Sequence, residues 1–267
     1  MGDTDVLRDM VGRESTNRED FAGTRQQDAP QFLGALLNLM AGQLEPRSNV
    51  RLQTMMEPTL LCESSCPAQG NECGTNRNFV QEKMLIVPVE NCKTLHECVT
   101  KLLMEEEIQR QKACQGCGST VVKRKGSIYS VPEVLIIQLK RMLHNPLDVD
   151  HPIKLAHRVT VPNEYQPITG GPLYILTGAL LHQGMSGGSG HYVCITKDVR
   201  RDAYYLINDE TVTQLSSMEA MDHINHSYLL IFCRKDCLEK QLVGTGGDHM
   251  LGITPLQVIT KIMIAVL

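Results

Sequence analysis

Apolar side chains recur at helical spacing in one early segment of the chain. Asp28 is a favourable N-cap residue, Pro30 falls in the first turn, where its missing N–H is not needed, and Gly42 is suited to end a helix. The positions between them form a broad apolar face made of Phe32, Leu33, Leu36, Leu37, Leu39 and Met40. This pattern predicts an amphipathic helix over 28–42 that packs against a core.

Later segments carry short apolar runs bounded by turn residues, which are typical of β-strands. Pro132 divides the run at 127–141 into two strands, and the second is apolar enough to be buried on both faces of a sheet. A helix rich in acidic residues is predicted at 95–108, and a glycine-rich loop at 184–190. The other predicted strands are 84–89, 159–162, 173–181, 192–195, 205–208 and 228–233. The mixture indicates an α+β protein.

Two polar residues on neighbouring predicted strands suggest catalysis. His191 stands at the start of an apolar strand, and Asn208 follows on the next strand, after a turn at 197–202. Adjacent strands joined by that turn bring both side chains together. In a thiol hydrolase the imidazole takes the proton from a cysteine, and an Asn or Asp orients the ring. We therefore interpret His191 as a base and Asn208 as its partner. Taken alone, His191 would be better explained as a packed histidine on a strand.

Composition narrows the class of protein. The chain has 267 residues, 42% of them hydrophobic and 21% charged, which predicts a globular protein of one large domain or two lobes. Its net charge of −4 gives no general attraction to nucleic acid. We interpret the basic run Lys123-Arg124-Lys125 as a solvated strand end. A zinc-ribbon protein that binds nucleic acid remains a weak alternative, because phosphate binding needs several clustered cations.

The termini and the cysteines bear on location. Residues 1–9 carry three acids and no apolar core, so we expect no secretory signal and an intracellular protein of the cytoplasm or nucleus. Ten cysteines are then better suited to metal binding, catalysis or burial than to disulfides. The tail at 251–267 is apolar but short and contains Lys261, so we expect a docking helix or an aberrant terminus rather than a membrane span.

Five motifs in one order resemble the catalytic domain of the ubiquitin-specific proteases. They extend over about two hundred residues, and together they are a far stronger signal than any one alone. They are Gln26-Gln27-Asp28-Ala29-Pro30-Gln31-Phe32-Leu33, Cys114-x-x-Cys117-Gly118 with Leu135-Ile136-Ile137-Gln138-Leu139-Lys140-Arg141, Leu180-Leu181-His182-Gln183-Gly184, Ser189-Gly190-His191-Tyr192 with Asn208-Asp209, and Ser227-Tyr228-Leu229-Leu230. The chain is therefore identified as similar to that family.

The resemblance implies a papain-like fold of thumb, palm and fingers with an antiparallel palm sheet. The partners it implies are ubiquitin and ubiquitinated proteins, with the isopeptide bond at the ubiquitin C-terminus as the substrate. His191 takes the position of the general base, Asn208 that of the orienting residue and Asp209 that of a second polar supporter. Asp28 matches the acid that meets the basic tail of ubiquitin. The remaining positions expected to bind substrate are Gln27, Gly190 and Tyr192.

One departure from the family concerns the nucleophile. The family carries it in an Asn-x-x-x-x-Cys box upstream of the Gln-Gln-Asp helix, whereas the first cysteine here is Cys62. We therefore expect a domain truncated on its N-terminal side, with an incomplete thumb. Gln31 also replaces a family Glu, which removes a negative charge. A non-catalytic ubiquitin-binding or scaffold pseudoprotease is the alternative function.

The resemblance also suggests a domain division. Residues 1–236 form the protease domain, with a thumb remnant at 1–45, fingers and part of the palm at 46–130, and the palm at 131–236. A separate tail covers 237–267.

Cysteine spacing suggests a structural zinc site. Cys114 and Cys117, followed by glycine, form a knuckle in which two thiolates share one tetrahedral metal. Alignment with the family puts a third ligand at Cys73, but the expected fourth position is Gly70. We therefore predict zinc bound by Cys66, Cys73, Cys114 and Cys117, with Cys62 in reserve. A decayed site with free cysteines is the alternative.

Overall fold

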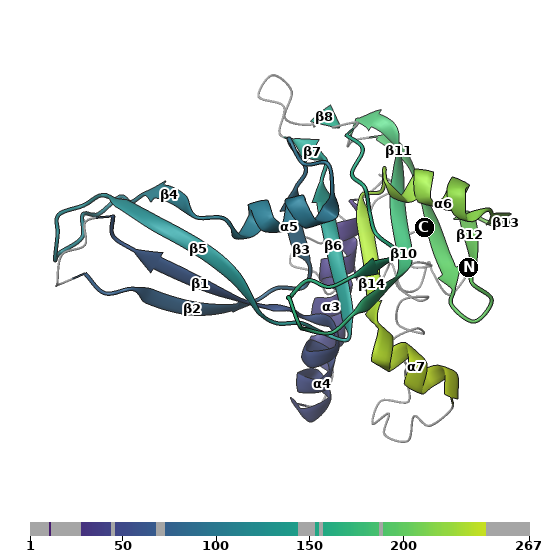
Figure 1. The fold of residues 1–267 in the computed structure, drawn as a ribbon, viewed down its shortest axis with the longest axis horizontal. Helices are drawn as coiled ribbons and strands as arrows, with labels where there is room; N and C mark the ends of the chain where they lie inside the picture. Colours follow the sequence, from purple (N-terminus) through teal and green to yellow (C-terminus); the bar gives the residue numbers. More distant parts are fainter. Residues whose placement is uncertain are drawn as a thin grey trace.

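The computed structural model describes residues 11, 28–43, 46–67, 73–143, 153–154, 157–186 and 189–243. A narrow extension made of one sheet projects from a larger body built on a second sheet (Figure 1). Gln27 and the tail from residue 244 lie outside the described residues. In the described ranges, no helix combines the length and the apolar character that crossing a bilayer requires.

The larger sheet has ten strands within the described ranges. They are β3 (Leu85–Pro88), β6 (Val134–Lys140), β7 (Met142–Leu143), β8 (Ile153–Lys154), β9 (Glu164–Tyr165), β10 (Tyr174–Ser186), β11 (Ser189–Asp198), β12 (Ala203–Asn208), β13 (Thr211–Leu215) and β14 (Leu229–Arg234). The main order is β13-β12-β11-β10-β14-β6-β3. All pairings are antiparallel except that of β3 with β6, which is parallel.

Helices cover both faces of this sheet. α3 (Ala29–Gln43) and α4 (Pro46–Met56) share one apolar cluster with Val134 and Ile136 of β6. α5 (Leu95–Leu103) and α6 (Ser217–Ile224) share the opposite cluster with Leu135 and Ile137. Successive side chains of a strand point to opposite faces, so β6 contributes to both cores. The prediction that this strand is buried on both faces is confirmed. α7 (Lys235–Val243) follows β14.

The extension is a four-stranded antiparallel sheet in the order β2-β1-β5-β4. Its strands are β1 (Thr59–Ser65), β2 (Asn76–Gln81), β4 (Glu106–Gln109) and β5 (Val121–Ser130). The basic run lies within β5, where Lys123 and Arg124 stand opposite Glu107 and Glu106 of β4. Lys123 also forms an ion pair with Glu105 at 3.1 Å. Opposite charges across strands stabilise a sheet, which gives these cations a structural role.

The same charges explain an error in the sequence prediction of one helix at 95–108. α5 ends at Leu103, Met104 is extended, and the acidic residues that follow form β4. Glutamate favours helices where no tertiary contact opposes its intrinsic propensity. Here Glu106 and Glu107 lie opposite two cations of β5 instead. The tertiary pairing has overridden the local preference.

Two further predictions need correction. The predicted strand at 159–162 is only an isolated bridge, in which Thr160 pairs with Thr94 and exchanges backbone hydrogen bonds with Lys93 and Leu95. The predicted loop at 184–190 is largely the hairpin of β10 and β11, because residues 184–186 and 189–190 are strand. By contrast, the helix predicted to begin after Asp28 is confirmed, since the Asp28 carboxylate accepts a hydrogen bond from the backbone N–H of Gln31.

Arg141, at the end of the Leu-Lys-Arg motif, is a buried cation that ties three segments together. Its side chain is 2% exposed and donates to the carbonyls of Ser227, at 2.6 Å, and Asn225, at 2.9 Å. It also donates to the carbonyl of His157. Burial lowers the pKa of Arg141 to about 10, which leaves it charged at neutral pH. The segment before β14 is therefore fixed to the end of β6.

We expect Arg141→Met to destabilise the fold, because the carbonyls of Ser227 and His157 would lose their donor and that of Asn225 would keep only the N–H of Val159. One unsatisfied buried group costs about 1–3 kcal/mol, so the free energy of unfolding in urea should fall by about 2–5 kcal/mol. The control is Arg201→Met, which removes a side chain that is 77% exposed and paired with Asp198. That variant should change stability by less than about 1 kcal/mol. Equal losses in the two variants would contradict this account.

Candidate active site and metal centre

His191 and Asn208 approach each other from adjacent strands. His191 lies in β11, opposite Gln183 of β10. Asn208 is the last residue of β12 and pairs with Thr211 across a two-residue turn that begins at Asp209. Asp209 has a φ of 49°, a left-handed conformation that Asp tolerates better than most residues. The tight turn thus places two polar side chains beside the imidazole.

The hydrogen bond between the two side chains defines the state of the ring. Nε2 of His191 lies 2.6 Å from Oδ1 of Asn208. An amide oxygen only accepts hydrogen bonds, so Nε2 must carry the proton and, in a neutral imidazole, Nδ1 keeps a lone pair. Oδ2 of Asp209 lies 3.8 Å from Nε2 and adds negative charge beside the pair. The imidazole is 42% exposed, so a reacting group can reach it.

Gly190 allows the His191 strand to approach its neighbour. Across the β10–β11 pair, Tyr192 stands opposite His182, and the two ring centroids are 4.8 Å apart. A Cβ on Gly190 would lie 2.4 Å from Nε2 of His182 and 2.5 Å from the carbonyl oxygen of Gln183. A larger residue at this position would collide with side chain and backbone at once. His182 is itself a buried residue inside β10.

Asp28 joins the start of α3 to the sheet. Its Oδ1 accepts from the N–H of Gln31 at 3.0 Å, and its Oδ2 accepts from the hydroxyl of Tyr228 at 2.8 Å. The N–H of Ala29 donates to the hydroxyl of Tyr192 at 3.4 Å. Burial raises the pKa of Tyr192 to about 12, so this hydroxyl stays neutral. The residue after His191 therefore contacts the helix that bears Asp28.

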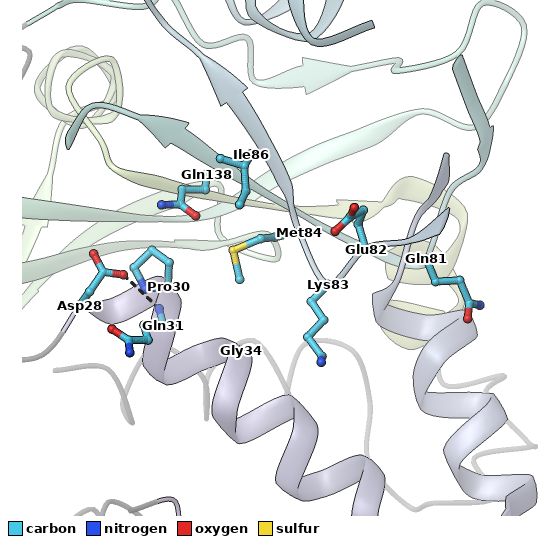
Figure 2. Close-up of a pocket in the computed structure, with 10 residues that line it drawn as sticks. All are labelled: Asp28, Pro30, Gln31, Gly34, Gln81, Glu82, Lys83, Met84, Ile86 and Gln138. Carbon is cyan, nitrogen blue, oxygen red and sulfur yellow. Dashed lines mark hydrogen bonds between the residues drawn. The ribbon is translucent and has the colours of Figure 1, made fainter. Parts of the chain in front are cut away.

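A groove of about 450 Å³ lies beside Asp28, between α3 and β3. Figure 2 shows Asp28 and Gln31 at the start of α3, with Gln138 and Ile86 on the sheet side and Lys83 further along. The complete lining is Asp28, Pro30, Gln31, Gly34, Gln81, Glu82, Lys83, Met84, Ile86 and Gln138. Six of these ten residues are polar or charged, so the groove offers hydrogen-bond partners along its length.

Four cysteines gather at the free end of the four-stranded sheet. Cys66 and Cys73 lie on the connection between β1 and β2, and Cys114 and Cys117 on that between β4 and β5. All four sulfurs lie within 4.8 Å of one another, and those of Cys73 and Cys114 are 3.8 Å apart. Zn–S bonds of about 2.3 Å in a tetrahedron require sulfurs separated by about 3.8 Å. This cluster has the geometry to hold a metal ion.

The protonation of the cluster also suits a cation. The N–H groups of Cys117 and Gly116 lower the pKa of the Cys114 thiol to about 6. The pKa of Cys73 is raised to about 12, first through its hydrogen bond with Cys117 and then by burial. The backbone therefore stabilises the thiolate of Cys114, whereas Cys73 needs a bound cation before it can lose its proton at neutral pH.

The structure brings together most of the residues expected from sequence. His191, Asn208 and Asp209 form one group, and the four predicted cysteines form another. Gln27 lies outside the described residues, and the reserve ligand Cys62 lies in β1, where its sulfur is 3.8 Å from a nitrogen of Arg124.

Sequence reasoning missed the roles of Tyr228 and Gln138 beside Asp28. Tyr228 was noted only as part of the closing motif. A usable signal was Gln138, which is the one polar residue within the apolar run at 134–139.

Comparison with known proteins gives one consistent family. The family model described as ubiquitin carboxyl-terminal hydrolase matches residues 4–232. Ubiquitin carboxyl-terminal hydrolase 48 of Danio rerio is 27% identical over 201 residues, which are 72% of this chain and 19% of that protein. Probable ubiquitin carboxyl-terminal hydrolase 9 of Schizosaccharomyces pombe is 26% identical over 218 residues, which are 75% of this chain and 36% of that protein. The chain thus spans well under half the length of these relatives.

Solved structures agree with the fold. The SAGA Ubp8/Sgf11/Sus1/Sgf73 DUB module bound to ubiquitin aldehyde contains a chain similar to this one with a TM-score of 0.68. The two are 24% identical, and the match covers 81% of this chain and 51% of the other. This likeness, together with the family match, shows the papain-like thumb, palm and fingers fold expected from the sequence.

We expect Gly190→Ala to disturb the β10–β11 pair at His191. Forcing extra atoms into a packed site costs about 1–3 kcal/mol, which urea unfolding should detect. The matched control is Gly34→Ala in α3, where an added Cβ would meet nothing within 4 Å. Alanine is the better helix former by about 0.5–1 kcal/mol, so the control should be stabilised. Two variants of equal stability would show that Gly190 is not required.

Proposed function

Because the chain belongs to the ubiquitin carboxyl-terminal hydrolase family of ubiquitin-specific proteases, we propose that it holds ubiquitin and supplies the base for cleavage of the isopeptide bond at the ubiquitin C-terminus. The contact between Nε2 of His191 and Oδ1 of Asn208 carries this proposal. It leaves Nδ1 as the only ring nitrogen able to accept a proton.

The proposed chemistry follows from that tautomer. Nδ1 of His191 accepts the proton of a cysteine thiol, and the thiolate attacks the carbonyl carbon of the isopeptide. The same nitrogen then returns the proton to the departing lysine amine. Asn208 keeps the ring in place through both transfers, and Asp209 lies near enough to stabilise the imidazolium between them.

The described cysteines make poor candidates for the nucleophile. Burial raises the pKa of Cys194 and of Cys233 to about 12, whereas an activated thiol has a lowered pKa. Cys114 has a lowered pKa but belongs to the four-cysteine cluster. We therefore propose that the 267 residues supply base, orienting group and ubiquitin contacts, but not the thiol. The pseudoprotease alternative shares the binding role and lacks the cleavage.

The groove beside Asp28 is the proposed site for the C-terminal tail of ubiquitin. A basic tail needs a negative partner, and Asp28 lines the groove at the helix that contacts the His191 strand through Tyr192. Gln31 contributes hydrogen-bonding capacity but no charge. Gly190 and Tyr192 are proposed to lie beside the tail, and Gln27 stays an expectation from the family resemblance.

We also propose that Cys66, Cys73, Cys114 and Cys117 hold a structural zinc ion. The sulfur spacing supports it, since a tetrahedral site needs that separation. Zinc would tie the two connections at the end of the fingers to each other and so keep β1, β2, β4 and β5 in register. The division into thumb remnant, fingers, palm and tail stays a prediction, and so does the intracellular location.

Titration with ubiquitin tests the proposed function. We expect shifts in the NMR spectrum of 15N-labelled ubiquitin, concentrated in its C-terminal tail. Asp28→Asn should weaken binding about tenfold, since a hydrogen bond to a charged group is worth about 1.5–3 kcal/mol, while Asn still caps α3. Asp222→Asn, which changes a side chain 71% exposed on α6, should leave the affinity unchanged. No shifts at millimolar concentration would remove the proposal.

Zinc analysis of purified protein tests the metal centre. We expect roughly one zinc per chain, and close to none in Cys73→Ser, because three thiolates hold zinc far less well than four. Cys62→Ser is the matched control, since its sulfur lies outside the cluster, and it should keep the metal. Loss of zinc in both variants would assign the fourth ligand to Cys62 in place of Cys66. Wild-type protein without zinc would favour the decayed site.

A further inference from the structure

The carboxylate of Asp28 is fixed from two sides. Its Oδ1 accepts from the N–H of Gln31 at 3.0 Å, and its Oδ2 accepts from the hydroxyl of Tyr228 at 2.8 Å. An ionised carboxylate has about four acceptor positions, so about two remain for a ligand. Asp28 lines the groove, which makes those positions available to a side chain that enters it.

Tyr228 is itself held rigidly. It is 4% exposed, its N–H donates to the carbonyl of Leu180 at 2.7 Å, and its carbonyl accepts from the N–H of Leu139 at 2.9 Å. The preceding residue, Ser227, is held by Arg141. Neighbouring strands on both sides therefore fix the backbone of Tyr228, and its ring is packed in the core. A phenol so anchored can set the direction of a carboxylate.

The hydrogen-bond direction in this group is determined by its chemistry. The side-chain amide nitrogen of Gln138 lies 3.1 Å from the hydroxyl oxygen of Tyr228, and an amide nitrogen can only donate. The single proton of the hydroxyl is then left for Asp28. Burial, with the charge of Asp28 as the next cause, raises the pKa of Tyr228, which keeps this proton in place.

Gln138 and Asp28 both line the same groove (Figure 2). The hydroxyl of Tyr228 connects their two side chains. The amide oxygen of Gln138 is the part of that side chain not used by Tyr228. The carboxylate of Asp28 and the amide oxygen of Gln138 thus both line the groove. The hydroxyl of Tyr228 contacts both side chains and orients them. Such a pair of acceptors suits a cationic side chain with several N–H donors.

We propose that Tyr228 is a positioning residue that orients Asp28 and Gln138 to receive a cationic side chain of the ubiquitin tail. The inference rests on the proposed function and adds a residue that the family motifs alone did not assign to the site. Tyr228 does not touch the tail itself. Its effect on binding passes through the carboxylate of Asp28, which makes the two residues energetically coupled.

A double-mutant cycle tests this coupling. The affinity for ubiquitin is measured by calorimetry for wild type, Tyr228→Phe, Asp28→Asn and the double variant. The phenylalanine keeps the ring and removes only the hydroxyl. We expect Tyr228→Phe to weaken binding about fivefold in the wild-type background and less than about twofold once Asp28 is already Asn. A purely structural role would give the same factor in both backgrounds.

Tyr165→Phe is the matched control. Tyr165 is also a buried tyrosine, 5% exposed, but its hydroxyl has no hydrogen-bond partner among the described residues. Its replacement should leave the affinity within about twofold of wild type. If Asp28→Asn weakens binding but Tyr228→Phe does not, the inference is wrong and the proposed function stands. If wild-type protein does not bind ubiquitin, the proposed function is wrong. The ubiquitin tail is then also the wrong ligand for this inference.

Discussion

The register between β11 and β12 governs whether His191 and Asn208 can meet. Ile195 stands opposite Leu206, and both belong to the apolar face covered by α5 and α6. Side chains alternate between the two faces along a strand, so His191 lies on the same face as Ile195, and Asn208 lies on the same face as Leu206. A slip of one residue would turn one partner to the opposite face. The apolar core therefore fixes the register, and the register brings the base to its orienting amide.

The second half of the site depends on how α3 docks on the sheet. Asp28 and Ala29, at the start of the helix, are held by the hydroxyls of Tyr228 and Tyr192. Tyr192 directly follows His191, so helix docking and the position of the base are linked through adjacent residues. Charges play a different role in the four-stranded sheet, where cross-strand ion pairs and the four cysteines order a sheet that has little core of its own.

The sequence indicated the parts of the site whose spacing reflects local geometry. His191 and Asn208 were predictable because a short turn joins their strands, and Cys114 with Cys117 because a knuckle needs that spacing. The helix at α3 was clear from its cap and apolar face. The role of Tyr228 was not predictable, because its contact with Asp28 joins residues 200 positions apart. β4 was missed because the pairing of Glu106 with Arg124 depends on a strand that comes later in the chain.

The central claim is that Asn208 holds His191 with its proton on Nε2 and its lone pair on Nδ1. The 15N chemical shifts of the ring nitrogens, assigned by comparison with a His191→Gln variant, report the tautomer directly. For the neutral form of the ring, we predict a proton on Nε2 in the wild-type protein and a mixture of tautomers in Asn208→Ala. A wild-type ring protonated at Nδ1, or one that Asn208→Ala leaves unchanged, would contradict it.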